Sequence, residues 1–378
     1  MIRKTLLVLS LIALFTSCDN DLKIIADWKD VPAVYGILNA QDSVHYIKLN
    51  RAFLGQGDVM MMAQEFDSLH YAVDQVGIRL IEKEEDDVPS QNGANWQTRN
   101  TYELEPTNEF VRPEGVFSSP TQTIYKTTAP LNKDFYYSVE VYRKSNDTII
   151  AQTDGPIPIL SPLSVINPNT FSALIILPNS YIPKVQWRSV SGGKMYELSM
   201  RFNYMEFPIS GESDTLFKSI EINYPSIFSI DTDGGDNMDY PLSYDQFLGF
   251  IAANIPEDPT VRRLVVGFDP SQTGSGGVSI KHACLDFSLS AAGEDLSTYL
   301  VLNENSNSLV LDRPEYSNIE NGVGILSSRT VKSVNGVKIS NQTNDEIAKS
   351  EVTKHLNFGY FTLNSSTNPP EIEINYGN

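Results

Sequence analysis

The stretch Phe135-Tyr-Tyr-Ser-Val-Glu-Val-Tyr142 decides the fold class of this chain. From Tyr137 onward apolar and polar residues alternate, and the same alternation is visible in Val44-His-Tyr-Ile-Lys-Leu49. Strict alternation places one face of a strand against a core and leaves the other face in water. The stretch therefore predicts an antiparallel β-sheet with one buried face.

Runs of the same kind recur along the first part of the chain, separated by clusters of Asn, Asp, Gly, Ser and Pro. Short runs rich in Val, Ile, Tyr, Phe and Thr, with turn signals between them, are typical of an all-β sandwich. We therefore expect an immunoglobulin-like β-sandwich over residues 28–155. Its strands are expected at Ala33–Leu38, Val44–Asn50, Val76–Glu82, Thr121–Thr127, Phe135–Tyr142 and Thr148–Thr153.

A proline-rich stretch follows this region, and residues 156–162 are expected to form an extended linker. Residues 163–378 are then expected to form a second antiparallel β-rich domain with two or three short helices. Its strands are expected at Ser172–Leu177, Lys184–Ser189, Met195–Phe207, Thr215–Tyr224, Arg263–Phe268 and Gly277–Leu289. Helices are expected at Ser243–Asn254, where Ser243 is an N-cap candidate, at Gly293–Asn303, and from Thr343 onward.

Length and charge limit the classes of function. A chain of 378 residues suits two domains, and 41% apolar with 20% charged residues excludes wholesale disorder. The formal net charge is −19, which repels the phosphates of nucleic acids and anionic lipid headgroups. We therefore expect no nucleic-acid binding and no direct electrostatic attraction to a membrane surface.

The N-terminus has the pattern of an export signal. Arg3 and Lys4 precede the apolar run Leu6–Phe15, which is roughly half the ~20 residues that a transmembrane helix needs. The following Phe-Thr-Ser-Cys18 resembles the lipobox of bacterial lipoproteins, in which the cysteine is acylated after cleavage. We expect residues 1–17 to be a signal peptide, Cys18 to be the lipid attachment site and residues 18–27 to be a lipidated tether. The alternative is an ordinary cysteine after a conventional signal peptide.

Two clusters are candidates for metal binding or catalysis. Asp231-Thr-Asp-Gly-Gly-Asp236 carries carboxylates suited to Ca²⁺, but Leu242 stands where an EF-type loop needs Glu, so a solvated turn is favoured. His282, Cys284 and Asp286 would share one face of a regular strand, as a zinc half-site or a Cys–His pair would require. A buried structural cysteine is favoured for Cys284. We therefore expect no enzyme, no metal site and no cofactor.

The remaining features concern the protein surface and the cysteines. The charge run Glu82–Asp87 is expected to be a solvated hairpin tip, and Trp96 beyond it is expected to fold back onto the sandwich rather than to stack on a ligand. Because one of the two cysteines is assigned to lipid, we expect no intramolecular disulfide. The tripeptides that begin at Asp42, Asp67, Asp147 and Asp214 resemble O-glycosylation sequons of Bacteroidetes.

Several motifs together resemble a family. Ala33-Val-Tyr-Gly-Ile-Leu38, His45–Gly55, Leu131–Val141 and Arg313–Ile325 are similar to segments of a domain-of-unknown-function family of Bacteroidetes outer-membrane lipoproteins. Genes of this family often lie beside TonB-dependent transporters of the starch-utilisation type. The acidic residues that follow Cys18 also resemble surface-export signals of such lipoproteins.

The resemblance implies a location and a partner rather than a reaction. It implies a lipid-anchored, non-enzymatic binding or accessory protein of the outer membrane, exposed at the cell surface beside a TonB-dependent barrel. A surface adhesion or structural lipoprotein without a transporter is the first alternative, and a hydrolase is the second. The ligand is unknown, because the resemblance supplies no ligand-binding residues.

Overall fold

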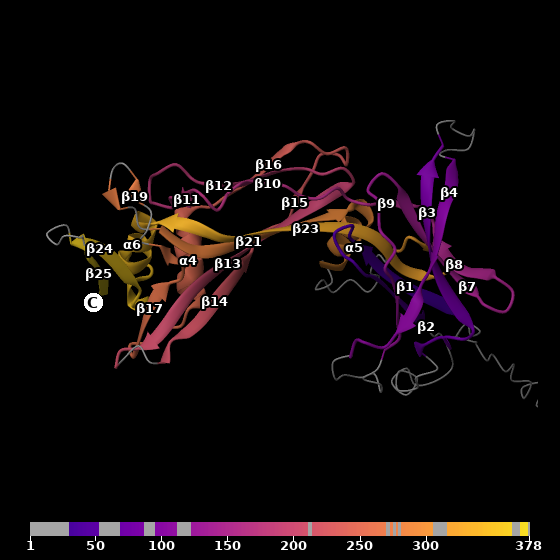
Figure 1. Cartoon of the computed structure of the whole chain (residues 1–378), viewed down its shortest axis with the longest axis horizontal. Helices are drawn as coiled ribbons and strands as arrows, with labels where there is room; N and C mark the ends of the chain where they lie inside the picture. The colour runs from indigo at the N-terminus through magenta and orange to yellow at the C-terminus, as the bar shows by residue number, and fades with distance from the viewer. Residues whose placement is uncertain are drawn as a thin grey trace, which may run out of the picture.

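Two β-rich lobes lie end to end along the long axis of the molecule (Figure 1). The computed structural model describes residues 30–52, 69–86, 95–111, 122–210, 214–269, 273–274, 277–278, 281–304, 316–364 and 371–376. The fold is mainly β, as expected, and it is dominated by a twelve-stranded sheet that passes through both lobes. No helix in these residues is long and apolar enough to span a bilayer.

The first lobe is a β-sandwich of immunoglobulin-like topology, which confirms the expected fold. One of its sheets contains β1 (Val31–Leu38), β2 (His45–Ala52), β5 (Glu105–Thr107) and β6 (Ile124–Thr127). The other contains β3 (Val76–Glu85), β4 (Trp96–Glu103), β7 (Tyr136–Arg143) and β8 (Thr148–Thr153). The strand orders β5-β6-β2-β1 and β4-β3-β7-β8 match the two sheets of an immunoglobulin domain.

The apolar residues of the alternating runs face each other between these two sheets. Val34, Leu38 and Ile47 come from one sheet, and Ile78 and Val139 come from the other, and all five are almost completely buried. The alternation of Tyr136–Arg143 thus has the predicted cause, because its inward positions line the core, while its outer positions are partly exposed except for Ser138, which is buried.

A strand from late in the chain completes the first lobe. β23 (Val323–Ser340) pairs in parallel with β1 through residues 323–328, and β22 (Ile319–Glu320) pairs with β8. Ile319 and Leu326 belong to the core of the first lobe. This lobe is therefore not built from residues 28–155 alone, and β23 continues from it into the second lobe (Figure 1).

The proline-rich stretch is packed rather than exposed. β9 (Ile157–Pro158) pairs with β7, and Ile157, Ile159 and Leu160 are buried. The hydroxyl of Ser328 in β23 donates a hydrogen bond of 2.6 Å to the carbonyl of Pro158. The crossover between the lobes is thus fixed to the strand that both lobes share.

The second lobe is built on β13 (Gly193–Pro208), β14 (Leu216–Asn223), β21 (Lys281–Gly293) and the rest of β23, in the order β14-β13-β21-β23. Shorter strands pair with this sheet, namely β11 (Ala173–Leu174), β15 (Ile227–Phe228), β17 (Val261–Val265) and β18 (Phe268–Asp269). A separate three-stranded sheet contains β10 (Val165–Asn167), β12 (Lys184–Arg188) and β16 (Asn237–Pro241). Two hairpins pair β19 (Thr273–Gly274) with β20 (Gly277–Val278) and β24 (Gly359–Asn364) with β25 (Glu371–Tyr376).

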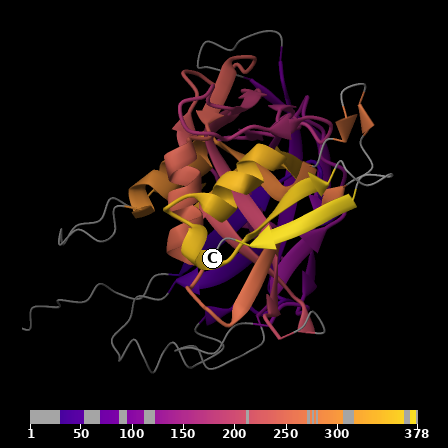
Figure 2. The ribbon, with the colours of Figure 1, turned by 90° about the vertical axis from the view of Figure 1, so that its left-hand side faces the viewer.

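Three α-helices in the described residues agree with the three expected from sequence. α4 (Tyr244–Asn254) has the predicted cap, because the Ser243 hydroxyl accepts a hydrogen bond from the Gln246 amide. α5 (Glu294–Glu304) also lies where expected, whereas α6 (Asn341–Lys349) begins earlier than Thr343, because Ser340 is its N-cap. A short 3₁₀ turn, η4 (Lys354–Leu356), follows α6. Figure 2 looks onto the outer end of this lobe, where the yellow C-terminal hairpin lies beside α6.

Candidate binding surfaces

The predicted lipid site, Cys18, lies outside the described residues. The described chain begins at Asp30, whose carboxylate accepts hydrogen bonds from Arg51 Nε at 3.0 Å and from the Tyr71 hydroxyl at 2.6 Å. Arg143 forms a third contact with Asp30, at 3.3 Å. Three side chains thus fix the start of β1, and residues 19–29 separate this fixed point from Cys18.

The expectation that His282, Cys284 and Asp286 share one face is wrong. The pairing of β21 with β23 shifts its register between His282 and Leu285 and again between Leu285 and Phe287. Cys284 and Leu285 are consequently both buried although they are neighbours, whereas Asp286 is only partly buried. A β-bulge has this effect because an extra residue reverses the alternation of faces.

The bulge separates the members of the supposed site. On the outer face, the Asp286 carboxylate accepts hydrogen bonds of 2.8 Å from the Asn203 side chain and from the Gly336 amide. On the inner face, burial raises the pKa of the Cys284 thiol and lowers the pKa of His282 to about 4. A protonated thiol and a neutral imidazole are poor partners for nucleophilic catalysis.

The Asp231–Asp236 segment forms a turn. Asp231, Asp233 and Asp236 are exposed, and the Asp231 carboxylate accepts a hydrogen bond of 3.0 Å from the Asp233 amide. The Asp236 amide donates to the Ser189 hydroxyl at 2.9 Å, which fastens the turn to the end of β12. Within the described ranges, no group of three or more His, Cys, Asp or Glu side chains is arranged to hold a metal ion.

The charge run Glu82–Asp87 is only partly solvated. Glu82 is 4% exposed, and its carboxylate accepts hydrogen bonds from the Tyr137 hydroxyl at 2.8 Å and from Asn100 at 2.7 Å. Glu84 and Glu85 are exposed as expected, and Asp87 lies outside the described residues. Trp96 packs against Tyr136 with ring centroids 4.6 Å apart, so it folds back onto the sandwich as predicted.

The four sequon-like tripeptides have different surroundings. Ser43, Thr148 and Thr215, the hydroxyl residues that follow Asp42, Asp147 and Asp214, are all exposed. Asp67 lies outside the described residues. These three hydroxyls are accessible, and glycosylation at the three tripeptides stays a prediction.

A polar face on the central sheet of the second lobe is the first candidate binding surface, and sequence reasoning missed it. Its side chains come from β14, β13, β21 and β23, where directly paired residues lie on the same face of the sheet. One cross-strand row contains Asn223, Ser199, Ser288 and Ser333, and the next contains Glu221, Arg201 and Asp286. We call these seven residues the polar sheet face.

Two adjoining cavities lie over the polar sheet face, and both are lined by Ser199 and Ser288. The first, of about 400 Å³, also contacts Glu197, Asn223 and Tyr224. The second, of about 230 Å³, also contacts the Arg201–Glu221 ion pair, whose atoms are 3.1 Å apart. Hydroxyl, amide and carboxylate groups here could exchange hydrogen bonds with a polar ligand.

A second candidate surface lies at one end of the three-stranded sheet of the second lobe. The Asn167 side chain of β10 donates a hydrogen bond of 2.8 Å to the carbonyl of Lys184 at the start of β12. Residues 168–172, which follow β10, and residues 178–183, which precede β12, therefore leave the sheet at the same end. We call these two loops the uncharged end, because residues 155–183 contain no Asp, Glu, Lys, Arg or His.

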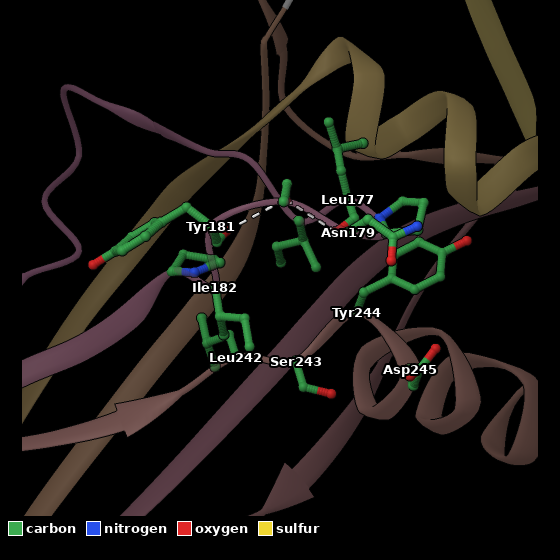
Figure 3. Close-up of a pocket in the computed structure, with 12 residues that line it drawn as sticks. Leu177, Asn179, Tyr181, Ile182, Leu242, Ser243, Tyr244 and Asp245 are labelled. Carbon is green, nitrogen blue, oxygen red and sulfur yellow. Dashed lines mark hydrogen bonds between the residues drawn. The ribbon is translucent and has the colours of Figure 1, made fainter.

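A cavity of about 250 Å³ lies beside the second of these loops (Figure 3). Its walls are residues 176–183 on one side and Leu242–Asp245, at the start of α4, on the other. The Tyr181 side chain points away from Tyr244 and Asp245 in this view and is 80% exposed (Figure 3). Periodicity could not reveal this surface, but the long absence of charged residues was visible in the sequence.

The chain matches no protein-family model and no curated protein in comparisons with known sequences. The resemblance described above therefore stays a prediction, and the geometry of the described residues is what bears on function.

Proposed function

We propose that this chain is a lipid-anchored, non-enzymatic protein of the outer-membrane surface that acts as a binding or accessory component beside a TonB-dependent barrel. The observation that carries the proposal is the order of charge, apolar run, small residues and cysteine in residues 1–18. That order assigns an acyl chain to Cys18, and acylation at more than one position gives stable anchoring.

The architecture supports a role in positioning. Residues 19–29 would reach roughly 20 Å as a random coil, so the first lobe would be held near the membrane. Because β23 is shared by both lobes, the second lobe and its surfaces would be held in a fixed relation to the first. A tethered protein meets a neighbouring barrel at high effective concentration, so a modest interface is sufficient.

The polar sheet face supports a role in binding. The Arg201–Glu221 ion pair and the hydrogen bonds that Asp286 accepts largely compensate the charges of this face within the protein. This favours a polar, uncharged ligand. Ser288 lines both cavities, so the Ser288→Trp variant should fill them without disturbing the buried core. Small neutral solutes that raise the melting temperature of the wild-type protein should fail to do so with this variant.

The anchor and the partner are tested in one experiment. Cells that express the wild-type protein or the Cys18→Ala variant are labelled with an alkyne fatty acid, and the protein is captured from solubilised outer membranes. We expect label and a co-purifying TonB-dependent barrel with the wild-type protein, and neither with Cys18→Ala. Cys284→Ala is the matched control, because it also removes a thiol but leaves the N-terminus intact.

An adhesion or structural lipoprotein is the second candidate function, favoured by the elongated arrangement of the two lobes (Figure 1). It predicts the same fatty-acid label on Cys18 but no barrel. Recovery of the labelled protein alone, with a crosslinker also finding no barrel, would favour this candidate. An unlabelled wild-type protein would contradict both.

A further inference from the structure

The uncharged end combines features that fit a second copy of the same surface. Phe171 and Tyr181 are 83% and 80% exposed, and Ile182 is about half exposed, as is Ile175 in the segment that joins the two loops. The chain as a whole has a formal net charge of −19. Two copies of the chain would repel each other if their acidic faces met, whereas contact through the uncharged end would place few charges close together.

The exposed side chains are held by ordered loops. The Asn169 side chain accepts hydrogen bonds from the amides of Phe171 at 3.0 Å and Ser172 at 2.9 Å. The Ser180 hydroxyl donates to the carbonyl of Leu177 at 3.0 Å. Residues held in this way lose little conformational entropy on association, so their exposed apolar area contributes more of its burial energy to binding.

The surface carries both a projecting aromatic residue and a hollow. Tyr181 projects into solvent, and the cavity of about 250 Å³ lies beside it (Figure 3). A cavity of ~150 Å³ accommodates benzene, so this one has room for a phenol ring. It lies below the ~300–1,000 Å³ typical of small-molecule sites, which favours a side chain as its occupant.

The walls of the cavity match the chemistry of a tyrosine side chain. Leu177, Ile182 and Leu242 supply apolar surface, and Asp245 supplies a carboxylate at the edge. Tyr244 is held in place because its hydroxyl donates a hydrogen bond of 2.7 Å to Glu346. A tyrosine ring entering the cavity would bury its apolar body and could donate its hydroxyl to Asp245.

We propose that the uncharged end is a self-association surface, on which Tyr181 of each copy occupies the cavity of the other about a twofold axis. A twofold interface requires a patch that is complementary to itself, and a projecting residue beside a matching hollow meets that requirement. Lys184 and Asp239 beside the second loop pair with each other at 3.1 Å, and Asp245 at the edge of the cavity would accept a hydrogen bond from the hydroxyl of the entering Tyr181.

Crosslinking of the full chain in detergent tests the proposal. In a background that carries Cys18→Ala, Ser180→Cys places a thiol beside Tyr181, while Cys284 is completely buried and does not compete for the reagent. With a short bis-maleimide, we expect Ser180→Cys to yield a product of twice the chain mass. The Cys18→Ala protein alone, and Thr98→Cys on the exposed surface of the first lobe in the same background, should yield none.

A second substitution tests the contact itself. Adding Tyr181→Ser to Ser180→Cys should reduce the crosslinked product more than about tenfold, as is typical for a buried aromatic anchor of an interface. Val111→Ser, which removes a 75% exposed apolar residue from the first lobe, should leave the yield unchanged. The yield from Ser180→Cys should also persist in high salt, because the contact contains few charges.

Sedimentation velocity provides a readout that does not depend on the reagent. The wild-type chain should sediment as a concentration-dependent dimer, and the Tyr181→Ser variant should sediment as a monomer with an unchanged melting temperature. A monomeric wild-type chain, a crosslinked product unaffected by Tyr181→Ser, or a product that contains a different protein would each overturn the proposal.

Discussion

The hydroxyl of Tyr137 lies 2.8 Å from the carboxylate of Glu82, deep between two strands of the first lobe. The same hydroxyl accepts a hydrogen bond of 2.9 Å from the Asn132 amide, a few residues upstream. This is the arrangement of the tyrosine corner in immunoglobulin-like domains. One phenol thus joins β7, β3 and the turn that leads into β7, and it satisfies a buried carboxylate.

Tyr137→Phe should lower the free energy of unfolding by about 1–3 kcal/mol, because it removes the acceptor of the Asn132 amide and leaves the buried Glu82 with one donor fewer, although Asn100 still donates to it. Denaturant unfolding measures this difference. Tyr136→Phe is the matched control, since Tyr136 contributes its ring to the contact with Trp96. If the two variants unfold at the same denaturant concentration, the corner does not stabilise the lobe.

The sequence predicted the elements whose stability depends on local patterns. Alternation located most strands of the first lobe, and a serine before an amphipathic run located the start of α4. The pattern did not reveal β23, because Gly324, Ser327 and Ser328 interrupt its apolar residues. β23 pairs with β1, which is far away in the sequence, and no local pattern encodes such a pairing.

The candidate sites show the same limit. Charge alone suggested a solvated Glu82, but its place on a strand beside Tyr137 buries it. Spacing alone put Asp286 beside Cys284, and a bulge separates them. The polar sheet face is assembled by pairing between four strands, so its residues share no motif. The lack of charged residues at the uncharged end could be seen in the sequence, but the cavity there depends on the position of α4.

His282 should make the stability of the second lobe depend on pH. Burial lowers its pKa to about 4 in the folded protein, below the 6.5 of an exposed histidine, although Asp345 opposes this shift. The unfolded chain then binds the proton more readily between these two values. Stability is therefore fully present above pH 6.5 and is lost as the pH falls toward 4, by roughly 3 kcal/mol.

His282→Gln removes this titration while keeping a polar side chain beside Phe361, whose ring lies 5.0 Å from that of His282. Urea unfolding of both proteins at pH 7 and pH 4.5 measures the effect. The variant should lose less stability than the wild-type protein between the two values. An identical loss in the two proteins would assign the acid sensitivity to other groups.

Cys284 should behave as a core residue. It is completely buried, and burial raises its thiol pKa, so it should react with a thiol reagent only after unfolding. Cys284→Ser should lower stability by about 1–3 kcal/mol, because it buries a hydroxyl among apolar side chains. Cys284→Ala should cost less. Zinc in the purified protein that disappears with either substitution would contradict a purely structural role.

Arg263 should be among the most sensitive charged residues of the second lobe. It is 1% exposed, pairs with Glu206 at 2.9 Å, and donates to the carbonyls of Leu356 at 2.7 Å and Pro256 at 3.0 Å. Arg263→Ala should cost about 3–5 kcal/mol, since it removes the buried partner of Glu206, which keeps its ion pair with Lys218, and leaves two carbonyls without this donor.

The neighbouring Arg262 is the matched control for this substitution, because its guanidinium only covers the ring of Tyr376, at 4.5 Å. Arg262→Ala should cost at most about 1 kcal/mol. Thermal unfolding of both variants provides the comparison. Equal losses would mean that the Arg263 network contributes no more than a surface contact.

Gly324 should determine whether the two lobes unfold together. It lies in the part of β23 that pairs with β1, it has φ +120°, and a Cβ atom there would meet the carbonyl oxygen of Val34 at 1.9 Å. Gly324→Ala should therefore force β23 away from β1 and cost more than ~3 kcal/mol. Gly235→Ala has a comparable φ of +94° but open space around its Cβ position, so it should cost only about 1 kcal/mol.

Because β23 contributes to the cores of both lobes, the damage at Gly324 should reach the second lobe as well. Trp96 reports on the first lobe and Trp187 on the second, so variants that lack Trp28 and retain only one of these two tryptophans resolve the two transitions. In the wild-type background both should unfold at one denaturant concentration, and Gly324→Ala should shift both together. A shift of the Trp96 transition alone would show that the shared strand joins the lobes without coupling their stability.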